Sequence, residues 1–183
     1  RVCFKFILRC VVATLSSKIK KDATFESYSN IVEMIGSRVN VDNIYRECKL
    51  LNASRSAKNL ADEVPSTPKL YDAIAKESAT RSRLTSIRCA LFPEMSLLKS
   101  AIRKIESHLR VAYAQDIKKY GSTVEERNQV VRRILHKGHY LLDSIESAIA
   151  VVDMILKDLD QNSYYTSNLT QVLGFMLDRR DRS

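Results

Sequence analysis

The chain has 183 residues, 45% of them hydrophobic, and a formal net charge of +9. This length suits one domain, or one domain with a small appendage. With only 4 Gly and 3 Pro, the composition argues against a turn-rich β protein. The four cysteines form no CxxC pair, so we interpret them as free thiols and expect a cytoplasmic protein, in the host cytoplasm if the chain is phage-encoded.

The positive charge is concentrated in two stretches. Residues 1–22 carry six basic and one acidic side chain, and residues 69–119 carry eleven basic and five acidic ones. Residues 23–68 and 120–183 are each close to neutral. Such asymmetry favours a polyanionic partner, either nucleic acid or an anionic membrane, whereas a solvated helix face is the alternative that needs no partner.

Three parts are expected along the chain. Residues 1–22 form a basic, apolar segment that is too short and too charged to span a membrane, although it could attach to a membrane surface or form a buried strand. Residues 23–64 are predicted to form short helices, one starting near Thr24 and another capped by Asp42. The linker at residues 64–68 leads into a helical core over residues 69–178.

The strongest signal is a heptad pattern in this core, in which apolar positions alternate at spacings of four and three. One row holds Leu70, Glu77, Leu84, Leu91, Leu98, Ile105 and Ala112, and the other holds Ile74, Arg81, Arg88, Met95, Ile102 and Leu109. The pattern predicts a long helix from Leu70 to Tyr120, with a kink at Pro93.

A tight turn is predicted to follow at Gly121, as a left-handed cap, with a capping box formed by Ser122 and Glu125 or by Thr123 and Glu126. A second row then predicts another long helix that ends near residues 161–163, before a short last helix. The row holds Val124, Asn128, Val131, Leu135, Gly138, Leu142, Ile145, Ile149, Val152, Leu156 and Leu159. We therefore predict an all-α fold: a long antiparallel helical hairpin, coiled-coil-like, with shorter packing helices.

Two arginines, Arg81 and Arg88, occupy seam positions, where charges are costly unless they are paired or face solvent. They could face phosphates, pair with acids of a neighbouring subunit, or be satisfied within the chain by Glu77 and the second helix. The basic character continues along the same helix. The candidate nucleic-acid-binding residues are Lys76, Arg81, Arg83, Arg88, Arg103, Lys104 and Arg110.

Motifs for catalysis are missing. The sequence contains no GxGxxG, P-loop, GxSxG or HExxH, and His136 and His139 alone do not make a metal site. We expect a protein that is not an enzyme, with no cofactor and no metal.

The layout resembles phage recombination-mediator proteins of the UvsY type over roughly residues 40–177. The resemblance is carried by the arginine-rich central helix, by residues 118–127 (KKYGSTVEER), and by a second helix with Lys157-Asp158-Leu159-Asp160. It implies a helical homo-oligomer that binds single-stranded DNA and loads a recombinase onto it. Arg81, Arg83, Arg88, Arg103 and Lys104 would then contact phosphates. Residues 1–21 depart from the family pattern, which leaves a virion or organellar component open.

Our leading hypothesis is a single-stranded nucleic-acid-binding recombination mediator whose basic residues over 69–119 neutralise phosphates in a sequence-tolerant, salt-dependent manner. The alternative is a structural assembly subunit of a virion or large complex, whose heptad faces dock neighbouring subunits. A third possibility is attachment to an anionic membrane through residues 1–21, although we do not expect a membrane partner.

Overall fold

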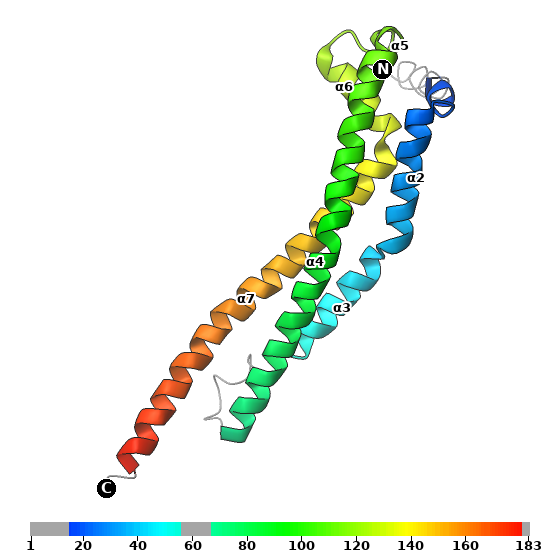
Figure 1. The fold of residues 1–183 in the computed structure, drawn as a ribbon. Coiled ribbons are helices and arrows are strands. Elements are labelled where there is room, and N and C mark those ends of the chain that lie inside the picture. Colours follow the sequence, from blue (N-terminus) through cyan, green and yellow to red (C-terminus); the bar gives the residue numbers. More distant parts are fainter. Residues whose placement is uncertain (1–14, 56–66, 181–183) are drawn as a thin grey trace. The chain divides into compact units, whose positions relative to one another are not determined.

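A computed structural model describes residues 15–55 and 67–180, and Figure 1 shows its helices in chain order. These are α2 (Ala23–Arg38), α3 (Val41–Ala53), α4 (Thr67–Ala112), α5 (Ala114–Lys118), α6 (Val124–Ile134) and α7 (His136–Arg180). No strand occurs in the described ranges, which confirms the all-α class. Among the described helices none is long and apolar enough to cross a membrane. The predicted attachment segment and linker fall largely outside the described residues.

The described residues divide into two compact units, and both α4 and α7 contribute to each. Unit 1 comprises residues 15–40 and 91–146, and unit 2 comprises residues 41–55, 67–90 and 147–180. The division of α4 lies between Ala90 and Leu91, close to Pro93, and the helix continues through this proline.

The core of unit 1 consists largely of the predicted seam residues. The buried apolar side chains include Leu98, Ile105 and Leu109 from α4, Phe25, Tyr28 and Ile35 from α2, and Val131, Leu135 and Ile145 from the segment of α6 and α7. Two pairs join α4 to α7: Lys99 to Glu146 at 2.6 Å and Glu106 to His139 at 3.3 Å. Because the later α4 position pairs with the earlier α7 position, the two segments run antiparallel within this unit.

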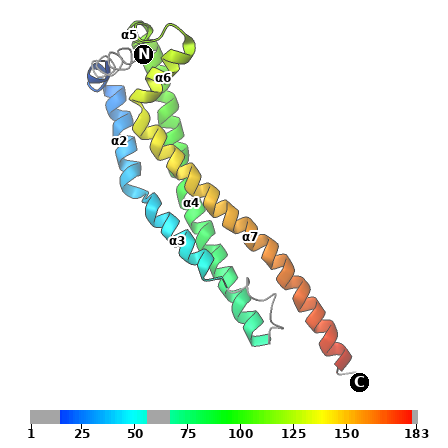
Figure 2. The same ribbon diagram turned by 180° about the vertical axis from the view of Figure 1, so that it is seen from behind.

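Helix α2 also belongs to unit 1, and it lies alongside α4 in both views (Figures 1 and 2). Its N-cap is Asp22, whose carboxylate accepts hydrogen bonds from the backbone N–H of Thr24 at 2.8 Å and of Phe25 at 3.4 Å. The other carboxylate oxygen lies 2.9 Å from Nε2 of His108 and accepts from the Tyr113 hydroxyl at 3.1 Å. One capping residue therefore starts α2 and fixes it to the end of α4.

Unit 2 has a smaller core made by α3, α4 and α7. Its buried residues include Cys48 of α3, Leu84 and Ile87 of α4, and Val152 and Leu159 of α7. Ala73, Thr80 and Ile87 form an additional buried row on α4 beside the predicted seam. An extra row is needed because α4 faces two helices here, α7 and α3, and a two-helix seam covers only one of these contacts.

Three predictions of helix boundaries were wrong. The first long helix ends at Ala112 rather than Tyr120, and the second is interrupted at Leu135, so that α6 and α7 are separate. In the other direction, α7 continues past residues 161–163 to Arg180, without the predicted connection. Asn and Ser only weakly disfavour a helix interior, so they did not end this helix. The antiparallel hairpin as a whole stays a prediction.

Candidate nucleic-acid interface

The seven predicted binding residues are divided between the two units. Lys76, Arg81, Arg83 and Arg88 belong to the unit 2 part of α4, whereas Arg103, Lys104 and Arg110 belong to the unit 1 part. The two groups differ in their surroundings, because the first has carboxylate partners and the second has none among the described residues.

The seam arginines are paired within the chain. A guanidinium nitrogen of Arg81 lies 2.5 Å from a carboxylate oxygen of Asp160, and one of Arg88 lies 2.7 Å from Asp153. Of the three explanations for seam arginines, the structure supports pairing with the second helix. The side chains stay between 43% and 62% exposed, so these ion pairs contribute little to stability and block the arginines only in part.

The other two basic residues of this group also have acidic neighbours. Arg83 donates to both carboxylate oxygens of Glu47 of α3, at 2.5 and 3.1 Å. This bidentate hydrogen bonding raises the pKa of Arg83 above its ordinary value. Lys76 lies 2.7 Å from Asp72, one turn earlier in α4. Unit 2 thus uses much of its positive charge to join its own helices.

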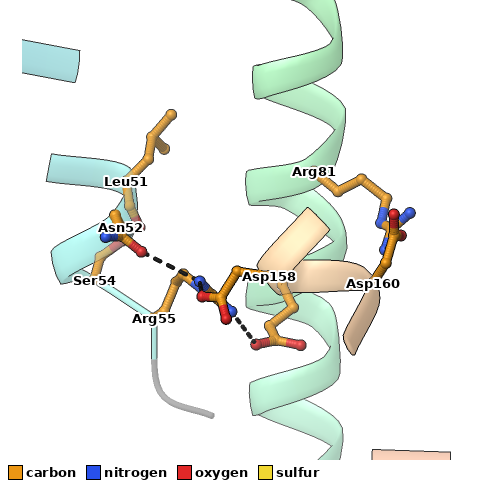
Figure 3. A network of polar contacts seen from close by, with 8 residues as sticks. Leu51, Asn52, Ser54, Arg55, Arg81, Asp158 and Asp160 are labelled. Carbon is orange, nitrogen blue, oxygen red and sulfur yellow. Dashed lines mark hydrogen bonds and ion pairs between the residues drawn. The ribbon is translucent and has the colours of Figure 1, made fainter. Parts of the chain in front are cut away.

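Arg55, which follows α3, was not singled out from the sequence, yet its side chain is fully buried in unit 2. Figure 3 shows it close to Asp158 of α7, with which it forms an ion pair and a hydrogen bond. It also donates to the side-chain oxygen of Asn52 at 3.2 Å and pairs with Glu77 of α4 at 3.6 Å. A buried cation between two carboxylates from different helices serves the structure of the unit. Glu77, an acidic residue at an otherwise apolar seam position, was the signal in the sequence that could have indicated a buried cationic partner.

Arg103, Lys104 and Arg110 of unit 1 are exposed, and they form no ion pair with another described residue. Arg110 lines a groove of about 290 Å³ near the end of α4, where the chain turns through α5 into α6. Lys118 and Arg127 line the same groove, together with Asn128. Its remaining lining is apolar, from Ala114, Ile117, Val124 and Val131.

The turn that forms this groove is determined by local sequence. Thr123 and Glu126 form the capping box of α6, which confirms the second of the two predicted pairings. The Glu126 carboxylate also accepts from the backbone N–H of Ser122 at 2.8 Å and from its hydroxyl at 2.9 Å. Hydrogen bonds from Thr123 and Ser122 lower the pKa of Glu126, so it stays ionised and its charge is held at the helix N-terminus.

Gly121 was predicted to adopt a left-handed conformation, and this was wrong: no described glycine has a positive φ. The reason for glycine at this position is space. A Cβ on Gly121 would lie 2.8 Å from the backbone nitrogen of Arg127 and 2.9 Å from the Cβ of Glu126. The glycine allows the backbone to pass close to the first turn of α6, which brings Arg127 to the groove.

Further cations follow in the same unit. Arg132, Arg133 and Lys137 are exposed on the last turn of α6 and the first turn of α7. Arg133 and Lys137 line a second cavity of about 240 Å³ together with Lys20, but Glu33 and His136 line it as well. The groove at Arg110, Lys118 and Arg127 has no acidic lining residue, and it is therefore the better candidate for a polyanion.

Among the described residues, no group of three or more His, Cys, Asp or Glu side chains is placed to hold a metal ion. His139 pairs with Glu106, and Nδ1 of His136 lies 3.2 Å from the carbonyl of Arg133. No protein-family model, curated relative or solved structure matches the chain.

Proposed function

We propose that this protein acts by binding single-stranded nucleic acid, without catalysis, through the groove at the α4–α5–α6 turn of unit 1. The observation that carries the proposal is the groove itself, which is lined by three cationic and four apolar side chains and by no acid. Phosphates suit the cations, and the faces of unpaired bases suit the apolar side chains. Single strands expose those faces, whereas a duplex stacks them away.

Binding of this kind is sequence-tolerant, because phosphate and base-face contacts do not read hydrogen-bonding edges. It is also salt-dependent, since each neutralised phosphate releases counterions. The exposed Arg103 and Lys104 extend the positive charge along α4 toward the groove end of the unit. Arg81, Arg83 and Arg88 contribute less in this proposal than in the sequence-based expectation, because each has an acidic partner.

The resemblance to UvsY-type mediators adds a more specific role to the proposal. A cytoplasmic homo-oligomer would hold the single strand and load a recombinase onto it. The segment from Lys118 to Arg127, which carries part of the resemblance, includes two of the three groove cations, Lys118 and Arg127. A strand-exchange assay with a recombinase on coated single strands tests this role, and no stimulation by the protein would reject it.

The binding proposal is tested by fluorescence anisotropy of a labelled oligothymidylate across a salt series. We expect binding that weakens steeply as salt rises. The logarithm of the binding constant should fall with the logarithm of the salt concentration, with a slope of about −0.7 for each phosphate contact. Absent binding at about 50 mM salt, or binding that does not change with salt, would contradict the proposal. A duplex of the same length provides the comparison, and we expect it to bind more weakly.

A further inference from the structure

A cavity of about 240 Å³ lies in unit 1 between α2 and the junction of α6 with α7. Two aromatic residues of α2, Phe25 and Tyr28, form part of its wall, and only 9% and 5% of their surfaces are exposed. Their ring centroids lie 5.7 Å apart. The Tyr28 hydroxyl donates to the backbone carbonyl of Leu135, which keeps the ring in place. The aromatic wall is therefore fixed by the core of the unit, and a ligand would not have to order it.

The helices on the two sides of the cavity run in the same direction. Helix α2 is antiparallel to α4, because Asp22 at its start lies 2.9 Å from His108 and Arg38 at its end lies 3.6 Å from Glu94. The α6–α7 segment is also antiparallel to α4 in this unit. Lining residues that come early along α2 and early along the α6–α7 segment therefore lie toward the same end of the cavity.

The charged lining differs between the two ends. Lys20, in the turn before α2, and Arg133, in the last turn of α6, are exposed cations at the first end. Glu33, about two turns further along α2 than Phe25, lies toward the second end with Lys137 of α7. Glu33 is the one acid among the described lining residues. A matching ligand carries an anionic group, a flat apolar part for the wall, and a hydrogen-bond donor for Glu33.

We propose that this cavity binds one nucleoside monophosphate. Its phosphate lies between Lys20 and Arg133, and its base lies against the aromatic wall, with N–H groups that donate to Glu33. Lys and Arg bind phosphate oxygens, base faces stack on aromatic side chains, and Glu accepts hydrogen bonds from base amino groups. The cavity is smaller than the roughly 300–1,000 Å³ of sites for drug-sized ligands, which suits one base with its sugar and leaves the phosphate at the exposed rim.

Other ligands match fewer of these features. The backbone phosphates of a strand would be repelled at Glu33, inorganic phosphate would leave the aromatic wall uncovered, and a fatty acid carries no donor for the carboxylate. Among the bases, guanine presents two adjacent N–H donors, which match both oxygens of a carboxylate. Thymine presents one N–H between two carbonyl oxygens, which a carboxylate repels. We therefore expect guanosine monophosphate to bind better than thymidine monophosphate.

This site is separate from the groove that is proposed to bind a single strand, so either proposal can fail alone. Isothermal titration calorimetry of the full chain with guanosine 5′-monophosphate tests it, with thymidine 5′-monophosphate, guanosine and inorganic phosphate as comparison ligands. We expect guanosine 5′-monophosphate to bind about tenfold more tightly than each of these, because each lacks at least one of the three contacts. Binding no tighter than that of any one of them would overturn the proposal.

Substitutions at the cavity test its two ends. Arg133→Gln should weaken the binding of guanosine 5′-monophosphate about tenfold and leave that of guanosine unchanged, since only the phosphate contact is lost. Arg132→Gln is the matched control, because Arg132 is an exposed cation next to Arg133 that does not line the cavity. Equal effects of the two substitutions would show attraction to a basic surface and would overturn the site. Glu33→Gln should remove the preference for guanine over thymine, and a preserved preference would contradict the contact with Glu33.

A variant of the groove separates the two proposals. Arg110→Gln with Lys118→Gln and Arg127→Gln changes three groove cations, none of which lines this cavity. We expect this variant to bind guanosine 5′-monophosphate as the unmodified chain does. Helicity by circular dichroism checks that each variant folds. Loss of nucleotide binding in the folded groove variant would assign the nucleotide to the groove and overturn the cavity as its site.

Discussion

The phenol of Tyr28 in α2 occupies the space that a side chain at Gly138 in α7 would need. A Cβ at Gly138 would lie 2.0 Å from the Tyr28 hydroxyl oxygen. The same hydroxyl donates a hydrogen bond to the backbone carbonyl of Leu135 at 3.3 Å, where α6 ends. Burial raises the pKa of Tyr28 to about 12, so the phenol remains a donor at physiological pH.

This fit predicts that Gly138→Ala destabilises the protein, although Gly→Ala in a helix usually stabilises it. We expect a loss of about 1–3 kcal/mol in the free energy of unfolding, because the added methyl group displaces Tyr28. Urea denaturation measures the change. Gly36→Ala is the control, since its Cβ would meet only Leu141 at 3.9 Å. A Gly138→Ala variant as stable as the control would contradict the fit.

Replacing Arg55 should have a large effect on stability. Arg55→Met removes the buried cation and leaves Glu77 and Asp158 facing each other without their partner. We expect a loss of about 3–5 kcal/mol in the free energy of unfolding, and a much smaller loss for Arg83→Met, because the ion pair of Arg83 is exposed. Chemical denaturation of both variants measures the difference. Equal effects would show that Arg55 does not join the three helices of unit 2 as described.

Acid should destabilise the protein through Asp22. The hydrogen bond from His108 lowers the pKa of Asp22 far below its ordinary value, and the contacts of Tyr113 and the backbone of Thr24 and Phe25 act in the same direction. Because the folded-state pKa is depressed, this contribution is present above the ordinary pKa of Asp and is lost as the pH falls below it. The measurement is stability as a function of pH between neutral and strongly acidic conditions.

Two substitutions separate the roles of Asp22. Asp22→Asn keeps a capping side chain but removes the charge, so it should flatten the acid dependence. Asp22→Ala also loses the cap, which should cost about 1 kcal/mol more at neutral pH. An acid dependence that is unchanged in Asp22→Asn would assign it to other carboxylates.

The seam arginines separate the proposed function from the structural alternative. If heptad faces dock neighbouring subunits through Arg81 and Arg88, then Arg81→Ala with Arg88→Ala should change the oligomer size. Because both arginines pair with Asp160 and Asp153 of their own chain, we expect an unchanged size by light scattering and a loss of at most about 1 kcal/mol per pair in stability. A changed oligomer size would favour the assembly subunit.

Heptad spacing predicted part of the apolar core. Leu84, Leu98 and Ile105 are buried as their spacing required, because a residue every three or four positions returns to the same side of a helix. The prediction was wrong at the ends of the pattern. Val124, taken as the start of the second row, is 67% exposed, since the core of that segment begins about two turns later at Val130 and Val131. Spacing alone does not show where a neighbouring helix stops.

The candidate site was less accessible to sequence reasoning. Averaging charge over residues 120–183 concealed Arg127, Arg132 and Arg133, because acids later in α7 cancelled them in the sum. The same averaging treated Arg81 and Arg88 as available, although their acidic partners lie some seventy residues later in the chain. A long-range pairing of this kind depends on the register of two helices, which a local pattern does not specify.

The most direct test of the proposed function compares two sets of three substitutions with equal loss of charge. The groove set is Arg110→Gln, Lys118→Gln and Arg127→Gln, and the paired set is Arg81→Gln, Arg83→Gln and Arg88→Gln. Anisotropy with a single-stranded oligonucleotide is measured across a salt series, and the logarithm of the binding constant is plotted against the logarithm of the salt concentration. In the groove set the slope of this plot should become less steep by about 2, and binding should be much weaker. The paired set should bind nearly as the unmodified protein does, and the reverse order of effects would contradict the groove as the binding site.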